Sequence, residues 1–87
     1  MSEYRTVFHP EARSELRKVP REAALRILTK LAELESDPFG FNTTALVSRS
    51  ERRRLRVRDY RVIYTVDNGE LVVWVIRVGH RSTVHGS

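Results

Sequence analysis

The chain has 87 residues, no cysteine and a formal net charge of +5 at pH 7. This length allows one domain with a modest core, which we expect residues 1–87 to form. The lack of cysteine excludes disulfides and thiolate metal sites and suits a reducing compartment, so we expect a cytoplasmic protein. We find neither a signal-peptide pattern nor an apolar run near the roughly 18 residues of a membrane span, and we expect no membrane contact.

The first half of the chain predicts a strand followed by two helices. Residues 4–8 end in an apolar pair and indicate a short strand. Pro10 suits the first turn of a helix, which we expect over about residues 10–18. Pro20 suits the first turn of a second helix. Its core-facing side chains follow at spacings of three and four: Ala24, Ile27, Leu28, Leu31 and Leu34.

The second half predicts a loop and then three strands. Residues 39–50 have no clean period, and we expect a loop there. Residues 51–66 indicate two strands with a tight reversal at residues 58–59, and the Asp-Asn-Gly-Glu sequence at residues 67–70 predicts a type I′ hairpin turn. Residues 71–78 are mostly apolar, as in a central strand. We therefore predict an α+β fold, β-α-α-β-β-β, with a helical hairpin packed on a mainly antiparallel four-stranded sheet.

Arginine is concentrated in the predicted sheet. Seven arginines lie within residues 49–61, offset only by Glu51 and Asp59. Residues 1–45 carry seven basic and seven acidic side chains, whereas residues 46–87 carry nine basic and four acidic ones, so the whole excess of +5 falls in the second half. Like charges side by side destabilise a sheet. The cluster therefore suggests an anionic partner, of which a phosphate backbone is the commonest.

The arginines also alternate with apolar side chains. Arg54, Arg56 and Arg58 alternate with Leu55 and Val57. Because successive strand side chains point to opposite faces, we expect the three guanidiniums on one face and the two apolar side chains in the core. The alternative is an ordinary solvated face, which is the usual meaning of polar alternation in antiparallel sheets.

Several of these features together resemble the RelE/ParE superfamily of bacterial toxin–antitoxin systems. They are the helical hairpin ending in Asp37-Pro38, the motif R-x-R-x-x-D-Y-R-V-I-Y over residues 54–64, and the final strand ending in V-G-H-R. The chain looks more similar to the RelE branch, which cuts mRNA on the ribosome, than to the ParE branch, which poisons DNA gyrase. The resemblance implies a toxin that acts as a ribosome-dependent mRNA endoribonuclease through attack of the ribose 2′-OH on the adjacent phosphodiester.

The resemblance also implies a set of catalytic residues. Arg54 and Arg56 stand where RelE has functional lysines, Arg61 and Arg81 stand at functional arginines, and His85 stands where many members have a tyrosine. The transition state of the cleavage gains negative charge, so fixed cationic donors accelerate the reaction. Arginine stays protonated, which makes Arg56 a poor general base. Histidine exchanges protons near neutral pH, so His85 is better suited to that role.

Binding partners follow from the same resemblance. We assign RNA binding to the remaining arginines of the cluster: Arg49, Arg52, Arg53 and Arg58. We expect no cofactor and no metal, because His80 and His85 lack further ligands. The implied partners are a cognate antitoxin, the ribosome with its mRNA, and operator DNA in a higher-order complex with the antitoxin. The alternative function is a binding module without nuclease activity, either a ParE-like gyrase inhibitor or a degenerate toxin that acts as co-repressor.

Some of these side chains also have structural alternatives. Arg61 could form an ion pair with Asp59 or Glu70. His80 is better explained as fixing the loop that carries Arg81. Three aromatic side chains could stack on bases or pack in the core: Tyr60, Tyr64 and Trp74.

Overall fold

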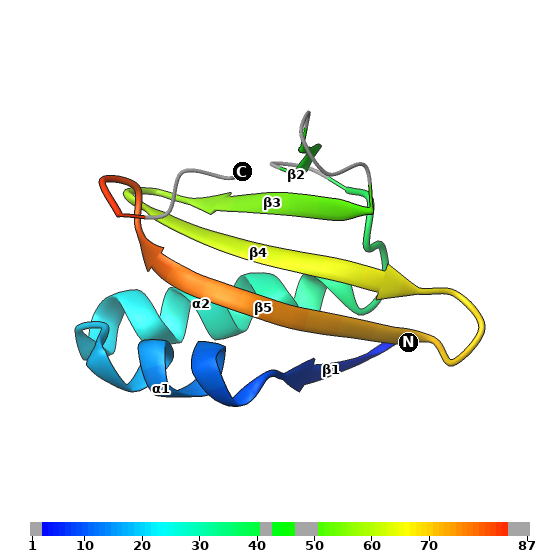
Figure 1. Cartoon of the computed structure of the whole chain (residues 1–87), viewed down its shortest axis with the longest axis horizontal. Helices are drawn as coiled ribbons and strands as arrows, with labels where there is room; N and C mark the ends of the chain where they lie inside the picture. The colour runs from blue at the N-terminus through cyan, green and yellow to red at the C-terminus, as the bar shows by residue number, and fades with distance from the viewer. Residues whose placement is uncertain (1–2, 41–42, 47–50, 84–87) are drawn as a thin grey trace.

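The computed structural model describes residues 3–40, 43–46 and 51–83. Its elements follow in the order β1 (Arg5–Phe8), α1 (Pro10–Lys18), α2 (Arg21–Leu34), β2 (Thr43–Ala45), β3 (Arg52–Val57), β4 (Tyr60–Asp67) and β5 (Val72–His80). In Figure 1, α2 runs behind the strands and α1 lies beside the end of β1. Neither helix in the described part of the chain is long and apolar enough to cross a membrane.

The strands form one mixed sheet in the order β1-β5-β4-β3-β2. β1 is parallel to β5, and the other neighbouring pairs are antiparallel. The predicted α+β class is confirmed, whereas the predicted number of four strands is wrong. The additional strand is β2, which lies in the segment expected to be a loop and pairs Thr43 with Leu55. Three residues are too few to show a strand period in the sequence, so pairing with β3 defines this strand.

The core lies between the helices and one face of the sheet. Ile27, Leu31 and Leu34 of α2 are buried, and they belong to one cluster with apolar side chains of β3, β4 and β5. Leu28 was expected in this stripe, but 42% of its surface is exposed. Each residue advances a helix by about 100°. Leu28 follows Ile27 by one position, so its side chain points away from the sheet.

α1 protects the edge of β5 where β1 ends. β1 pairs with β5 only as far as Val75. Beyond that point, Glu15 of α1 accepts a hydrogen bond from the backbone N–H of Val78 at 2.8 Å. The same carboxylate binds the guanidinium of Arg77 through Nε and Nη2, at 3.0 and 2.9 Å. A side chain thus satisfies a strand edge that would otherwise lack an acceptor.

The two hairpin turns differ from each other. The reversal between β3 and β4 has two residues, as predicted, and Arg58 at its first position has φ 55. The predicted type I′ turn after β4 is wrong, because Asp67 pairs with Val72 and four residues lie between them. The carboxylate of Asp67 accepts the N–H groups of Gly69 and Glu70, which closes a longer turn.

Candidate nucleic-acid interface

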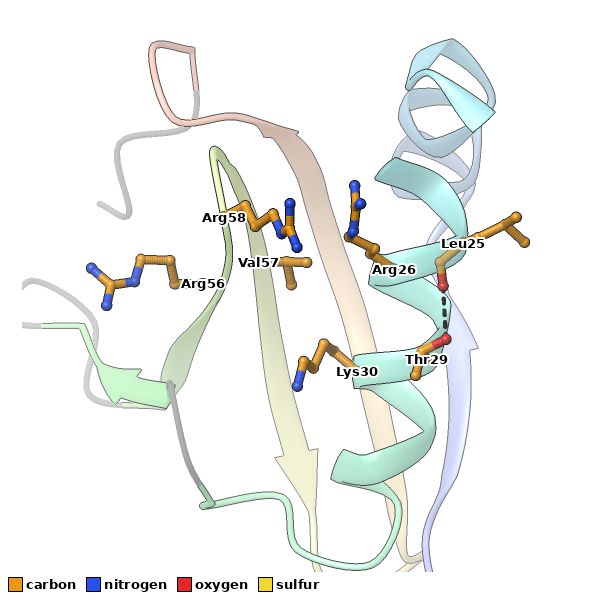
Figure 2. Close-up of a pocket in the computed structure, with 7 residues that line it drawn as sticks. All are labelled: Leu25, Arg26, Thr29, Lys30, Arg56, Val57 and Arg58. Carbon is orange, nitrogen blue, oxygen red and sulfur yellow. Dashed lines mark hydrogen bonds between the residues drawn. The ribbon is translucent and has the colours of Figure 1, made fainter. Parts of the chain in front are cut away.

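The three alternating arginines of residues 54–58 do not share one face of the sheet. Leu55 and Val57 are buried in the core cluster, so Arg54 and Arg56 project from the face opposite the helices, as predicted. Arg58 does not follow them. It lies in the turn, and in Figure 2 its side chain points toward α2 while that of Arg56 points away. The expectation that all three guanidiniums share one face is therefore wrong for Arg58, because its positive φ interrupts the alternation of the strand.

Arg61 of β4 joins the two arginines of β3 on this face. It lies directly opposite Arg56 in the antiparallel register, and directly opposed residues point to the same face. Arg54, Arg56, Arg61 and Thr44 line a hollow of about 200 Å³. We call it the phosphate hollow. On the other side of Arg61, the opposed residue of β5 is Gly79, which has no side chain to fill the space.

Backbone carbonyls hold the Arg61 guanidinium in place. Its Nη1 donates to the carbonyl oxygens of Arg58 at 3.2 Å and Tyr60 at 3.3 Å. Neither Asp59 nor Glu70 forms an ion pair with Arg61 among the described residues. Within the described part of the chain, the guanidinium is therefore held in position without an ion-pair partner.

The electrostatics show that the arginines converge. Partial burial lowers the pKa of the Arg61 guanidinium, and nearby positive charges lower it further: those of Arg54, Arg56 and Arg81. The carboxylate of Asp59 acts in the opposite direction and is the smallest of these influences. Three cations therefore lie close enough to repel the charge of Arg61. A bound anion would relieve this repulsion.

Arg81 lies near the turn between β3 and β4. Its backbone N–H donates to the carbonyl of Asp59 at 2.7 Å. Its Nε is 3.8 Å from an Asp59 carboxylate oxygen, and both side chains are more than 60% exposed. Such exposed ion pairs contribute little free energy. The Arg81 guanidinium is therefore available to an anion.

His80 makes the local contacts expected of a structural residue. Its Nδ1 lies 2.9 Å from the hydroxyl of Ser82 and accepts the Ser82 N–H at 3.2 Å. Its carbonyl accepts the N–H of Thr83 at 2.9 Å. These bonds bracket Arg81 and shape the segment that carries it.

Other arginines predicted to bind RNA lie in different surroundings. Arg53 donates to the Thr43 hydroxyl at 2.9 Å, and its guanidinium lies 5.0 Å from the centre of the Phe39 ring. These contacts fit a packing role, so we leave Arg53 out of the proposed site. Arg52 is half-buried at the start of β3. Arg49 and His85 lie outside the described residues.

The three aromatic candidates are engaged in packing. Tyr64 is fully buried, and its hydroxyl donates to the carbonyl of Pro38 at 2.6 Å. Tyr60 meets the ring of His80 edge to face at 5.5 Å. Trp74 makes the same kind of contact with His9, also at 5.5 Å.

The phosphate hollow can bind and polarise a phosphate group. Its lining contains three guanidiniums and one hydroxyl, and no carboxylate or imidazole among the described residues. The described residues also contain no cluster of His, Asp and Glu that could hold a metal ion. Thr44 was missed in the sequence because it lies in a segment without periodicity, opposite Arg54 in the β2–β3 pair. Guanidiniums stay protonated at neutral pH, so the described lining contains no general base.

Comparison with known proteins identifies the family. A family model described as the ParE toxin of type II toxin–antitoxin systems, parDE, matches residues 6–85. The chain belongs to the RelE/ParE superfamily of type II toxins. No curated protein sequence matches the chain significantly.

Solved structures resemble this RelE/ParE toxin over most of its length. The archaeal RelE–RelB complex of Pyrococcus horikoshii OT3 is 27% identical, with a TM-score of 0.79 over 97% of this chain and 100% of that one. The RelBE2 toxin–antitoxin complex of Mycobacterium tuberculosis is 25% identical, with a TM-score of 0.80 over 90% and 98% of the two chains. A mutant E. coli RelE bound to an antitoxin peptide is 29% identical, with a TM-score of 0.80 over 92% and 84%.

All three of these relatives were solved together with an antitoxin or a peptide from one. The matching family model carries the ParE name, whereas these structures carry the RelE name. The superfamily and the fold agree in both comparisons.

Proposed function

We propose that this toxin is an mRNA endoribonuclease that acts on the ribosome as a single domain over residues 1–87. The observation that supports this most is the convergence of Arg54, Arg56 and Arg61 on one hollow without a carboxylate among the lining residues. Like charges that face each other on a sheet, without a direct ion-pair partner, destabilise it. They suit a phosphodiester that passes through a more negatively charged transition state.

In the proposed reaction, the ribose 2′-oxygen attacks the adjacent phosphorus and the bond from phosphorus to the 5′-oxygen breaks. The products are a 2′,3′-cyclic phosphate and a 5′-hydroxyl. Arg54 and Arg61 donate to the non-bridging oxygens, whose negative charge increases in the transition state. Arg56 and Arg81 complete the cationic surroundings. The 2′-OH loses its proton to a base, and the 5′-oxygen gains one. His85 remains our predicted proton carrier.

Dependence on the ribosome follows from the composition of the hollow. Guanidiniums can stabilise charge, but they do not remove a proton at neutral pH. A site without a strong base in its lining gains most from a substrate held with its 2′-oxygen in line for attack. The ribosome would supply that alignment. We expect little cleavage of free RNA.

The proposal includes a cognate antitoxin and a cytoplasmic site of action, where the ribosomes are. The relatives solved with antitoxins support the first of these. An antitoxin that covers the phosphate hollow would place carboxylates against its arginines. Together the two proteins would form the complex on operator DNA.

The test is expression in a bacterial host followed by mapping of transcript 5′ ends. The active chain should arrest growth and create new 5′ ends within translated messages. Arg54→Ala and Arg61→Ala should each abolish both effects. Arg13→Ala is the matched control, because Arg13 is an exposed arginine on α1 away from the hollow. Full cleavage by Arg61→Ala would refute the site.

A ParE-like gyrase inhibitor is the second candidate, because the matching family model describes ParE toxins. This function predicts growth arrest with inhibited DNA supercoiling by purified gyrase and no new transcript ends. A degenerate toxin serving as co-repressor predicts neither arrest nor cleavage, with operator binding in the presence of its antitoxin. The three outcomes are distinct in the same set of strains.

A further inference from the structure

The hydroxyl of Thr44 lies among the cations of the phosphate hollow. Thr44 of β2 stands directly opposite Arg54 of β3 in the antiparallel register, so both side chains project from the open face of the sheet. Thr44 is exposed, and it lines the hollow together with Arg54, Arg56 and Arg61. Among the described residues, it is the only lining side chain that is not an arginine.

Thr44 differs from the arginines in the hydrogen bonds that it can form. A guanidinium has N–H donors and no acceptor, whereas a hydroxyl both donates and accepts. Within the described lining, Thr44 is therefore the only side chain that can accept a hydrogen bond. The arginines can donate to the oxygens of a phosphate group. They cannot accept the hydrogen of an O–H group on the same ligand.

Contacts on both faces of the sheet hold the short strand β2 in place. On the helix side, the Thr43 hydroxyl accepts a hydrogen bond from Nη2 of Arg53 at 2.9 Å. On the open face, Leu46 packs against Ile63, and both side chains are buried. These contacts flank Thr44 and fix the backbone that carries its hydroxyl. A binding group on a fixed element keeps its position without an ordering cost when the ligand arrives.

The size of the hollow suits a phosphate group together with part of the neighbouring ribose. Its volume of about 200 Å³ is several times the roughly 30 Å³ that a water molecule occupies in the liquid. In the proposed reaction, the attacking 2′-hydroxyl lies beside the phosphate that the guanidiniums bind. This hydroxyl is both donor and acceptor, and it is the group that distinguishes RNA from DNA.

We infer that Thr44 accepts a hydrogen bond from the ribose 2′-hydroxyl and thereby makes the phosphate hollow selective for RNA. The inference rests on the proposed function, because it takes an RNA phosphodiester as the occupant of the hollow. The hydrogen bond directs the 2′-hydroxyl hydrogen toward β2 and leaves a lone pair of the 2′-oxygen for the phosphorus. No bond to Thr44 forms or breaks, and no proton passes to it. Thr44 is thus a specificity-determining residue.

The test is fluorescence anisotropy on the full chain with three labelled single strands of the same sequence. They are an RNA, its 2′-fluoro analogue and a DNA. The 2′-fluoro strand keeps an RNA-like sugar but cannot donate a hydrogen bond from the 2′ position. The parent should bind the RNA about two- to tenfold more tightly than the 2′-fluoro strand, which is the contribution of one neutral hydrogen bond. Gel electrophoresis afterwards checks that the RNA is intact.

Three variants isolate the hydroxyl. Thr44→Val has nearly the same shape and suits a strand, but it cannot accept a hydrogen bond. It should weaken RNA binding by about two- to tenfold and leave binding of the 2′-fluoro strand and the DNA unchanged. Thr44→Ser keeps the hydroxyl and should keep the preference for RNA. Thr65→Val is the matched control, because Thr65 lies opposite Arg52 on the same face, outside the lining of the hollow. Urea denaturation verifies that each variant folds.

Three results would overturn the inference. Equal weakening of all three strands by Thr44→Val would mean that the hydroxyl donates to a phosphate oxygen instead of accepting from the ribose. An unchanged preference for RNA in Thr44→Val would mean that the 2′-hydroxyl is bound by another group. Loss of the preference in Thr44→Ser as well would mean that the shape of the threonine side chain is recognised and not its hydroxyl.

These measurements detect binding and not cleavage, so the two proposals can fail separately. If the parent creates no new transcript ends but Thr44→Val loses the preference for RNA, the nuclease proposal fails and the ribose contact remains. If Arg54→Ala and Arg61→Ala abolish cutting but Thr44→Val keeps the full preference, the nuclease proposal holds and the inference fails. In cells, Thr44→Val should create fewer new transcript ends than Thr44→Ser. Equal cutting by these two variants would count against the contact.

Discussion

Arg56 and Arg61 lie directly opposite each other across β3 and β4, on the face of the sheet that the helices leave open. Opposed like charges destabilise a sheet by roughly 0.2 to 1 kcal/mol. Arg56→Thr should therefore raise the free energy of unfolding by about that amount, because threonine also suits a strand. Urea denaturation at low ionic strength measures the gain. RNA affinity should fall in the same variant.

Salt provides the control for this prediction. The Debye length falls to about 3 Å in 1 M salt, so repulsion between the guanidiniums of Arg56 and Arg61 should be screened. The stabilising effect of Arg56→Thr should then shrink toward zero. A gain that persists undiminished in high salt would have to come from strand propensity and not from charge.

The sequence predicts the parts of this site that depend on local periodicity. A strand has a side-chain period of two. Alternation along β3 therefore places Arg54 and Arg56 on one face of the sheet and the buried Leu55 and Val57 on the other face. The length of the following turn then determines whether Arg61 joins them. Two turn residues bring Arg61 opposite Arg56, and one residue more or fewer would have turned it to the core.

Other features depend on contacts that no local pattern shows. The positive φ of Arg58 turns its side chain toward α2, and an arginine gives no warning of such a conformation. Arg53 resembles its neighbours in the sequence, yet it packs on Phe39 because β2 supplies a hydroxyl acceptor at Thr43. The long-range partner decides the role of each arginine in this cluster.

Glu15→Ala should destabilise the protein by roughly 1 to 3 kcal/mol. The substitution leaves the N–H of Val78 without its acceptor and removes both contacts to Arg77. Glu15 is the main reason that the pKa of Arg77 is raised. Thermal denaturation should show a lower midpoint, whereas Glu11→Ala, an exposed acidic residue of the same helix, should change it little. Equal losses in the two variants would indicate a general effect on α1.

Tyr64 should make stability depend on alkaline pH. Burial raises the pKa of its hydroxyl above the ordinary value of 10.0, so the unfolded chain ionises first as the pH rises. The stability contribution is complete below about pH 10 and is lost as the pH rises through the folded-state pKa. The free energy of unfolding should therefore decline above that pH.

Tyr64→Phe tests the origin of this decline. The variant loses the hydrogen bond to the Pro38 carbonyl and should be less stable at neutral pH by roughly 1 to 3 kcal/mol, because the carbonyl loses its buried donor. Its alkaline decline should be flatter than that of the parent. Tyr4→Phe, at a half-buried position, serves as the comparison. A parent and a Tyr64→Phe variant with parallel pH profiles would exclude Tyr64 as the titrating group.

Leu71→Gly should stabilise the protein, although it removes a large apolar side chain. Leu71 has φ 56, a left-handed conformation that costs an L-residue about 1 to 2 kcal/mol. Its side chain is 41% exposed, so little packing is lost. We expect a net gain of roughly 0.5 to 1 kcal/mol in urea denaturation after the greater chain entropy of glycine is deducted. Leu71→Ala retains the unfavourable φ and should show no gain. If alanine stabilises as much as glycine, the exposed leucine side chain is the cause and the backbone argument is wrong.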